Sequence, residues 1–109
     1  MTDTCIVLTA CGSEETARTI AQDLIGHGLA ACVTLLPGAQ SYYIYGGRPH
    51  SDPEVQLIIY TRSDAFAEVE AHIRLKHTFE VPEIFRLAID GGSEEALAWV
   101  RNAVRKVQP

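Results

Sequence analysis

Histidine and cysteine are the residues of this chain that are best suited to hold a metal ion. Copper(I) prefers sulfur ligands, whereas copper(II) and zinc accept imidazole and carboxylate. The cysteines show no CxxC spacing, and no His-x-x-x-His pair would place two imidazoles on one helix face. His72 and His77 lie on either side of an expected helix end and share no face. A metal site would therefore assemble in space from His77 and Cys11, with Glu83 or a residue of a neighbouring subunit as a further ligand.

Each of these side chains also has a structural interpretation. Cys5 and Cys32 fall inside apolar, strand-like runs and are expected as small core residues, because reduced cysteine is often buried. Cys11 differs because it ends its run. The alternative for His77 is a solvent-facing or loop-capping side chain. The histidines that fall in expected turns, and are expected to be solvated, are His27 and His50.

The chain carries no arrangement of residues that is typical of an enzyme. A catalytic nucleophile needs a base that a third group holds in place, and neither a GxSxG elbow nor a comparable Cys–His pairing is present. No glycine-rich loop leads into a phosphate-binding helix with a lysine. The spacing of Glu54, Glu80 and Glu83 alone does not define an acid–base pair. We therefore expect a non-enzymatic protein without an obligatory cofactor.

Composition places the chain among globular, single-domain proteins. Its 109 residues suffice for one core, and we expect one domain over residues 1–109. The net charge of −5 and the lack of a basic cluster argue against nucleic-acid binding. The longest apolar run is far shorter than the roughly 20 residues of a membrane span, and the first residues lack the positive charge of a signal peptide. We expect a cytoplasmic protein that binds neither nucleic acid nor membrane.

The longest β-rich stretch, Leu29 to Thr61, predicts one long hairpin. Valine, isoleucine, threonine and tyrosine suit a pleated strand, Gly46-Gly47 supplies turn chemistry, and Pro37-Gly38 predicts a bend or bulge. The first arm, Leu29 to Tyr45, would span on the order of 55 Å at about 3.3 Å per residue. A compact domain of this size has a radius of gyration of only about 13 Å. Such an arm, with tyrosines in its outer half, is expected to contact another chain.

The remaining patterns predict the order β-α-β-β-α-β followed by one more helix. The apolar run Thr4–Ala10 is typical of a buried central strand, and helices are expected to begin at Ser13, at Ser63 or Asp64, and at Ser93. We predict an α+β fold, a ferredoxin-like antiparallel sheet with helices on one face, a long hairpin between its second and third strands, and an extra C-terminal helix. The other face would expose apolar side chains and, with the hairpin, indicates a closed homo-oligomer.

A series of short motifs runs in order along nearly the whole chain. They are Leu29-Ala30-Ala31-Cys32-Val33, Pro37-Gly38, Tyr42 to Gly47, Glu54-Val55-Gln56, His77 through Ile84 with Val81-Pro82-Glu83-Ile84, and Trp99. Together these motifs resemble the CutA divalent-cation tolerance family. The resemblance implies a PII-like homotrimer that closes through its long hairpins, and a link to copper and other divalent metal ions.

The resemblance also implies a place for a copper site. The ligands proposed in that family are a cysteine near the end of the first strand and two adjacent histidines. In this chain the cysteine position falls on Thr9, with Cys11 two residues away, and Lys76 stands beside His77 in place of the second histidine. The candidate metal ligands are therefore His77 and Cys11, and the candidate ion is copper or another divalent cation.

A second group of candidate residues belongs to the expected junction between subunits. The residues that would line a ligand cleft there are Tyr45, Gln56, Tyr60 and Glu83. The alternative is that the tyrosines pack at an oligomer interface, where this residue is enriched. The leading hypothesis is a trimeric protein that takes part in the response to divalent metal ions and binds copper. The alternatives are a PII-like signalling trimer that binds a small metabolite at inter-subunit clefts, and a trimeric scaffold that anchors a partner protein.

Overall fold

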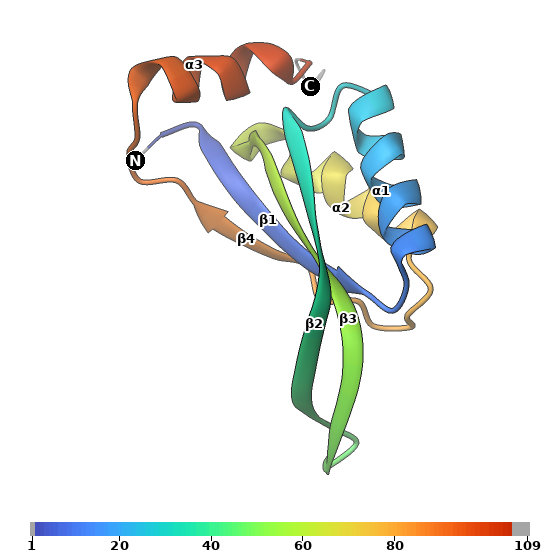
Figure 1. The fold of residues 1–109 in the computed structure, drawn as a ribbon. Coiled ribbons are helices and arrows are strands. Elements are labelled where there is room, and N and C mark those ends of the chain that lie inside the picture. The colour runs from blue at the N-terminus through green and yellow to red at the C-terminus, as the bar shows by residue number, and fades with distance from the viewer. Residues whose placement is uncertain (1, 106–109) are drawn as a thin grey trace.

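Strands and helices follow one another in the predicted order (Figure 1). The structure, a computed structural model, describes residues 2–105, so Met1 and residues 106–109 of the expected domain lie outside the described part. The strands are β1 (Thr4–Cys11), β2 (Cys32–Tyr45), β3 (Arg48–Arg62) and β4 (Phe85–Ala88); the helices are α1 (Glu14–Gly26), α2 (Phe66–Lys76) and α3 (Glu94–Ala103). None of these helices is long and apolar enough to cross a membrane.

The strands form one antiparallel sheet in the order β2-β3-β1-β4. This order, with the connections β1-α1-β2 and β3-α2-β4, confirms the predicted ferredoxin-like fold. β3 lies between β1 and β2, and side chains along it alternate between the two faces of the sheet. Leu57 and Ile59 are fully buried on the side that α1 and α2 cover, whereas Ile58 and Tyr60 point to the other side and are only partly buried.

Apolar side chains of α1 and α2 pack against the covered face of the sheet and form the core. Each large aliphatic side chain buried in this way stabilises the fold by about 1.5–3 kcal/mol. The largest apolar members of this core are Val7, Ile20, Leu24, Leu29, Leu57, Ile59, Val69 and Ile73, each at most 1% exposed.

The helix starts were predicted correctly in two cases of three. Ser13 accepts a hydrogen bond from the Thr16 N–H at 3.2 Å, and Ser93 caps α3 in the same way. The expected cap of α2 at Ser63 or Asp64 was wrong. Residues 63–65 form a 3₁₀ turn before α2, and the Asp64 carboxylate pairs instead with Arg62 at 2.9 Å.

β2 and β3 extend beyond the sheet as a two-stranded hairpin (Figure 1). Gly46 and Gly47 both have positive φ, 61° and 75°, as a two-residue turn between twisted strands requires. The register shifts between Leu36 and Ala39, which confirms the irregularity predicted at Pro37-Gly38. The longest extent of the described residues is 42 Å. The expected arm length was an overestimate, because β2 begins at Cys32 and the strand is irregular.

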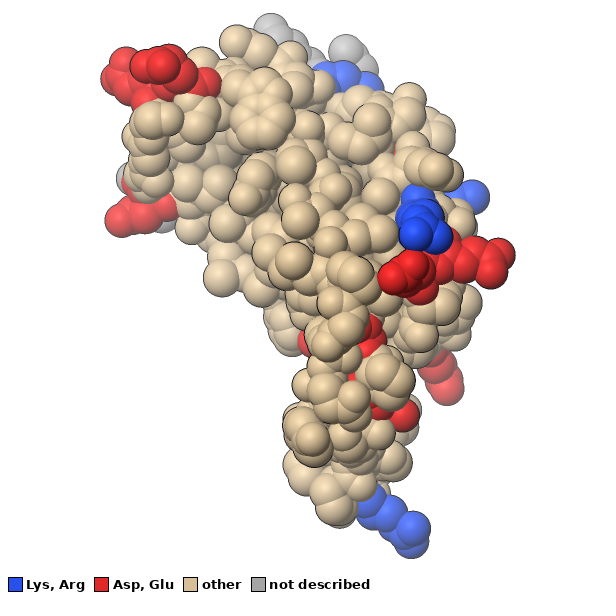
Figure 2. Space-filling view, viewed as in Figure 1, with Lys and Arg blue, Asp and Glu red and all other residues tan. Residues whose placement is uncertain are grey.

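The second face of the sheet is apolar, and neither α1 nor α2 covers it. Leu36, Phe85 and Leu87 on this face are 47%, 60% and 46% exposed. Figure 2 shows few charged side chains over the strands between α3 and the hairpin. We call this surface the open face, and its residues are Ile6, Leu8, Leu36, Ile58, Tyr60, Phe85 and Leu87. Contiguous exposed apolar surface of this kind is typical of an interaction site.

One buried hydroxyl generates a prediction about stability. Thr9 Oγ1 is buried without a hydrogen-bond partner among residues 2–105, whereas Thr61 Oγ1 donates to the Leu29 carbonyl at 2.7 Å. Because a buried unsatisfied polar group costs about 1–3 kcal/mol, Thr9→Val should raise the free energy of unfolding by about 1 kcal/mol in urea titrations at fixed protein concentration. Thr61→Val, the matched control, should lower it. Equal effects of the two substitutions would contradict this account of Thr9.

Candidate functional site

His77 lies where the chain leaves α2, and its ring ties this point to the end of β1. Its Nε2 lies 2.7 Å from the Ala10 carbonyl oxygen, and its Nδ1 lies 3.1 Å from the Phe79 backbone nitrogen. Because a backbone N–H can only donate, Nδ1 accepts and the ring proton resides on Nε2. These bonds give His77 a loop-capping role, and a metal ion on this ring would replace one of them. Metal ligation by His77 stays a prediction.

Cys11 is fully buried at the end of β1, on the side of the sheet that faces the helices. Burial raises the pKa of its thiol to about 11, and the negative charge of Glu54 acts in the same direction. Cysteine binds metals as the thiolate, so these surroundings oppose ligation. His77 bonds to the residue next to Cys11, but within residues 2–105 no group of three or more close metal-ligand side chains includes either of them.

The four cleft candidates are distributed along the molecule. Tyr60 pairs with Cys32 at one end of the β2–β3 ladder, and Tyr45 pairs with Arg48 at the other end. The structure of one chain therefore does not bring these two tyrosines together.

The other two cleft candidates occupy different surroundings. The Gln56 side-chain amide donates to the Thr9 carbonyl at 3.0 Å, which holds it against β1. Glu83 is exposed in the segment between α2 and β4. A shared cleft for all four residues would need a second copy of the chain, and it stays a prediction.

An apolar pocket of about 280 Å³ lies between α3 and one end of the open face. Ile6 and Tyr60 form its floor on the sheet, and Trp99 and Val100 are among the residues of α3 that line it. Trp99 is 49% exposed, so the pocket opens beside an exposed aromatic side chain. Of the cleft candidates, Tyr60 lines this pocket.

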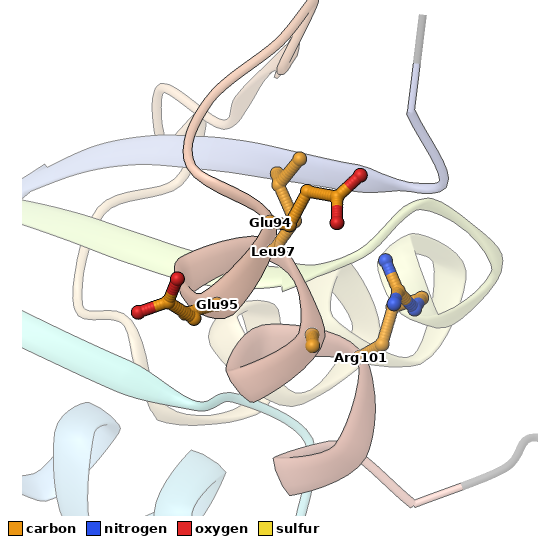
Figure 3. Close-up of a pocket in the computed structure, with 5 residues that line it drawn as sticks. Glu94, Glu95, Leu97 and Arg101 are labelled. Atoms are coloured by element: carbon orange, nitrogen blue, oxygen red, sulfur yellow. The ribbon is translucent and has the colours of Figure 1, made fainter.

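A larger hollow of about 470 Å³ runs along the surface of α3 (Figure 3). Its lining residues are Glu94, Glu95, Leu97, Ala98 and Arg101, all from this one helix. Figure 3 shows that Glu94 and Glu95 point away from each other, so their carboxylates do not converge on a common point. The hollow is a feature of the helix surface and has no opposing wall.

The closest group of potential metal ligands was missed by the sequence analysis. Asp23, His27 and His72 each place one ligand atom within 4.8 Å of the others. His27 was expected to be a solvated turn residue, and it is largely exposed, but its Nδ1 lies 3.3 Å from the Asp23 carboxylate. The Asp-x-x-x-His spacing of residues 23 and 27 was the available signal. A search for paired histidines overlooks it, because one ligand is a carboxylate.

The fold places the chain in the ferredoxin-like class of α+β proteins, with a hairpin that extends beyond the sheet. Within that class, the family model of the CutA1 divalent ion tolerance protein matches residues 5–103. The chain belongs to this family, which confirms the resemblance seen in its motifs.

Relatives with similar sequences carry the same family name. The chain is 41% identical over 96 residues to the divalent-cation tolerance protein CutA of Thermus thermophilus, covering 88% of this chain and 93% of that protein. It is 35% identical over 100 residues to the chloroplastic protein CutA of Arabidopsis thaliana, covering 92% of this chain and 55% of that protein. The chain thus spans little more than half the length of the plant relative.

Solved structures agree with these sequence relationships. The structure of the divalent cation tolerance protein from Thermus thermophilus superposes with a TM-score of 0.90 at 38% identity, covering 94% of this chain and 99% of that one. The structure of CutA1 from Oryza sativa gives a TM-score of 0.92 at 32% identity, covering 97% of each chain. The fold is therefore that of the CutA1 structures.

The buried thiols should be unreactive in the folded protein. Burial raises the pKa of both Cys5 and Cys11, and only the thiolate reacts with a disulfide reagent. In a Cys32→Ser variant at pH 8, neither thiol should react until the chain is unfolded in guanidinium. Because the folded state holds the Cys11 proton more strongly, the free energy of unfolding should also fall as pH rises from 9.0 to about 11. Rapid labelling of folded Cys32→Ser protein would contradict the burial.

Proposed function

We propose that this chain acts as a non-enzymatic homotrimer that binds a divalent metal ion, with copper as the first candidate, and takes part in the response to such ions. The observation that carries the proposal is the family match over residues 5–103, because that family is described as divalent ion tolerance proteins. Its relatives in Thermus thermophilus and Pectobacterium atrosepticum are named divalent-cation tolerance proteins as well.

The shape of the single chain supports assembly. Tyr42, Ile44 and Tyr45 in the outer hairpin are 81%, 71% and 60% exposed. These apolar and aromatic side chains and the open face would all be in water in a lone chain. Burial of apolar surface stabilises by about 25 cal/mol per Å². Contact with further copies would therefore stabilise the assembly by removing these side chains from water. If the hairpin of one copy packs on a different surface of the next copy, each copy is rotated relative to the one before it. The copies form a ring when these rotations add up to a full turn.

A metabolite-binding signalling trimer is the second candidate function. The observation that favours it is the apolar pocket of about 280 Å³ beside α3, which Tyr60 and Trp99 line. Small-molecule sites are concave and mostly apolar. The pocket has few polar groups to orient a ligand, since Tyr60 supplies the one side-chain hydroxyl among its lining residues. The metabolite-binding trimer is therefore the second candidate, after the trimer that responds to metal ions.

Native mass spectrometry of the reduced protein, with and without copper(II), tests the leading proposal. The wild-type chain should appear as a trimer that gains copper. Ile58→Glu places a charge in the open face and should produce mainly monomers, with helix content by circular dichroism as the check of folding. Leu75→Glu is the control, because Leu75 is a similar aliphatic side chain that is 77% exposed on α2, outside the open face.

A monomeric wild-type protein would contradict the trimer. Thermal melting distinguishes the two candidate functions, since a ligand that binds the folded state raises the melting temperature. A rise with nucleotides or organic anions but none with copper(II) would favour the metabolite-binding trimer over the metal response.

A further inference from the structure

We propose that Asp23, His27 and His72 form a binding site for a divalent first-row transition-metal ion between α1 and α2. The inference rests on the proposed function in one respect, because both require that the chain binds a divalent ion. It gives the ion a location that differs from the His77 and Cys11 positions.

The last turn of α1 positions two of the three side chains. Asp23 and His27 are four residues apart, and this spacing places them on the same helix face. The His27 backbone N–H donates to the Asp23 carbonyl at 3.1 Å, so the helical turn itself fixes their separation. His72 comes from α2, and its Nδ1 lies 2.7 Å from Asp23 Oδ2. The Asp23 carboxylate therefore stands between two imidazoles.

The separations of the ligand atoms are close to those of a metal site. Histidine nitrogen and carboxylate oxygen bind zinc at about 2.0–2.2 Å, so neighbouring ligand atoms lie roughly 3–3.5 Å apart. The two imidazole–carboxylate distances are 2.7 and 3.3 Å. The rings of His27 and His72 are tilted by 60° with centroids 4.8 Å apart, so they do not stack face to face. The three ligand atoms lie within 4.8 Å of one another, and the His27 ring would turn away from the Asp23 carbonyl oxygen, 2.9 Å from its Nδ1, to bind the same ion as the other two.

Burial at the site is uneven, as an accessible metal site requires. The Asp23 and His72 side chains are 13% and 24% exposed and are held between the helices, whereas His27 is 56% exposed. An ion can therefore enter past His27. The packing of α1 and α2 covers the face of the sheet opposite to the open face, so contacts between copies through the open face would leave this entrance free.

The ligand types define the class of ion. Two imidazoles and one carboxylate suit copper(II), zinc, nickel and cobalt(II), whereas copper(I) prefers sulfur. Among divalent ions, copper(II) should bind tightest. Three protein ligands leave a coordination position for water, which favours an exchangeable ion over a permanent structural one.

The Arg105 guanidinium lies beside His27 and has a carboxylate partner of its own. The Arg105 Nε donates to the His27 carbonyl oxygen at 2.8 Å, and the same guanidinium pairs with Glu68. The Asp23 carboxylate thus faces two titratable rings, while the neighbouring guanidinium already has a carboxylate partner. A bound divalent ion would replace two hydrogen bonds, that of His72 Nδ1 with the Asp23 carboxylate and that of His27 Nδ1 with the Asp23 carbonyl oxygen, with metal bonds that link α1 to α2.

Titration of tag-free, reduced trimer with copper(II) and with zinc tests the site by native mass spectrometry and calorimetry. We expect one ion per chain, and electron paramagnetic resonance of the copper form should show coupling to two nitrogens. His27→Gln changes a largely exposed side chain, so it should weaken binding at least tenfold without loss of the trimer. The double variant His27→Gln/His72→Gln should abolish binding. The matched control is His50→Gln, an exposed histidine of the hairpin, which should bind as the wild type does.

Different failures point to different conclusions. One failure is that binding changes less than threefold in the folded His27→Gln and double-variant proteins but is lost in His77→Ala. This result would overturn the Asp23–His27–His72 site and leave the proposed function standing. A wild-type trimer that binds neither copper(II) nor zinc would overturn both. In that case the Asp23–His72 contact serves only to join α1 and α2, and the Asp23–His27 contact belongs to the end of α1.

Discussion

The pairing of β3 with two neighbouring strands is the interaction on which the rest of the structure depends. From Gln56 to Tyr60 this strand pairs with both β1 and β2, and from Arg48 to Glu54 it pairs with β2 alone. Side chains alternate between the two faces of β3. A slip of one residue in its pairing would therefore move side chains such as Leu57 from under the helices to the open face, and side chains such as Ile58 in the opposite direction. One register thus creates the core, the open face and the hairpin.

The same core packing places the proposed metal ligands. Leu24 and Ile73 are fully buried between the helices and the sheet, and each is the immediate neighbour of a ligand, Asp23 and His72. The spacing of Asp23 and His27 could be read from the sequence. The approach of His72 could not, because it depends on how two helices distant in sequence pack. In our proposals, metal binding therefore falls to the helix layer, and assembly falls to the opposite face and the hairpin.

Features that depend on neighbouring residues were predictable from the sequence. Ser13 and Ser93 cap their helices through the N–H group three residues on, and the positive φ of Gly46 and Gly47 follows from their lack of a side chain. The start of α2 is an exception, because Asp64 pairs with the guanidinium of Arg62 two residues earlier and residues 63–65 form a 3₁₀ turn before the helix. The order of elements needed only apolar periodicity, so the ferredoxin-like fold was predicted correctly, whereas long-range polar contacts, such as that of His77 with the Ala10 carbonyl, were not.

Hydrogen exchange measures most directly whether other copies of the chain cover the hairpin. The outer hairpin, Ala39–Tyr45 with its partner strand, is a two-stranded ribbon without a core of its own chain, and such ribbons are marginally stable in water. If further copies pack against it, its hydrogen-bonded amides should exchange as slowly as those of β1 in the core. Exchange of these hairpin amides within seconds, while β1 remains protected, would contradict assembly through the hairpin.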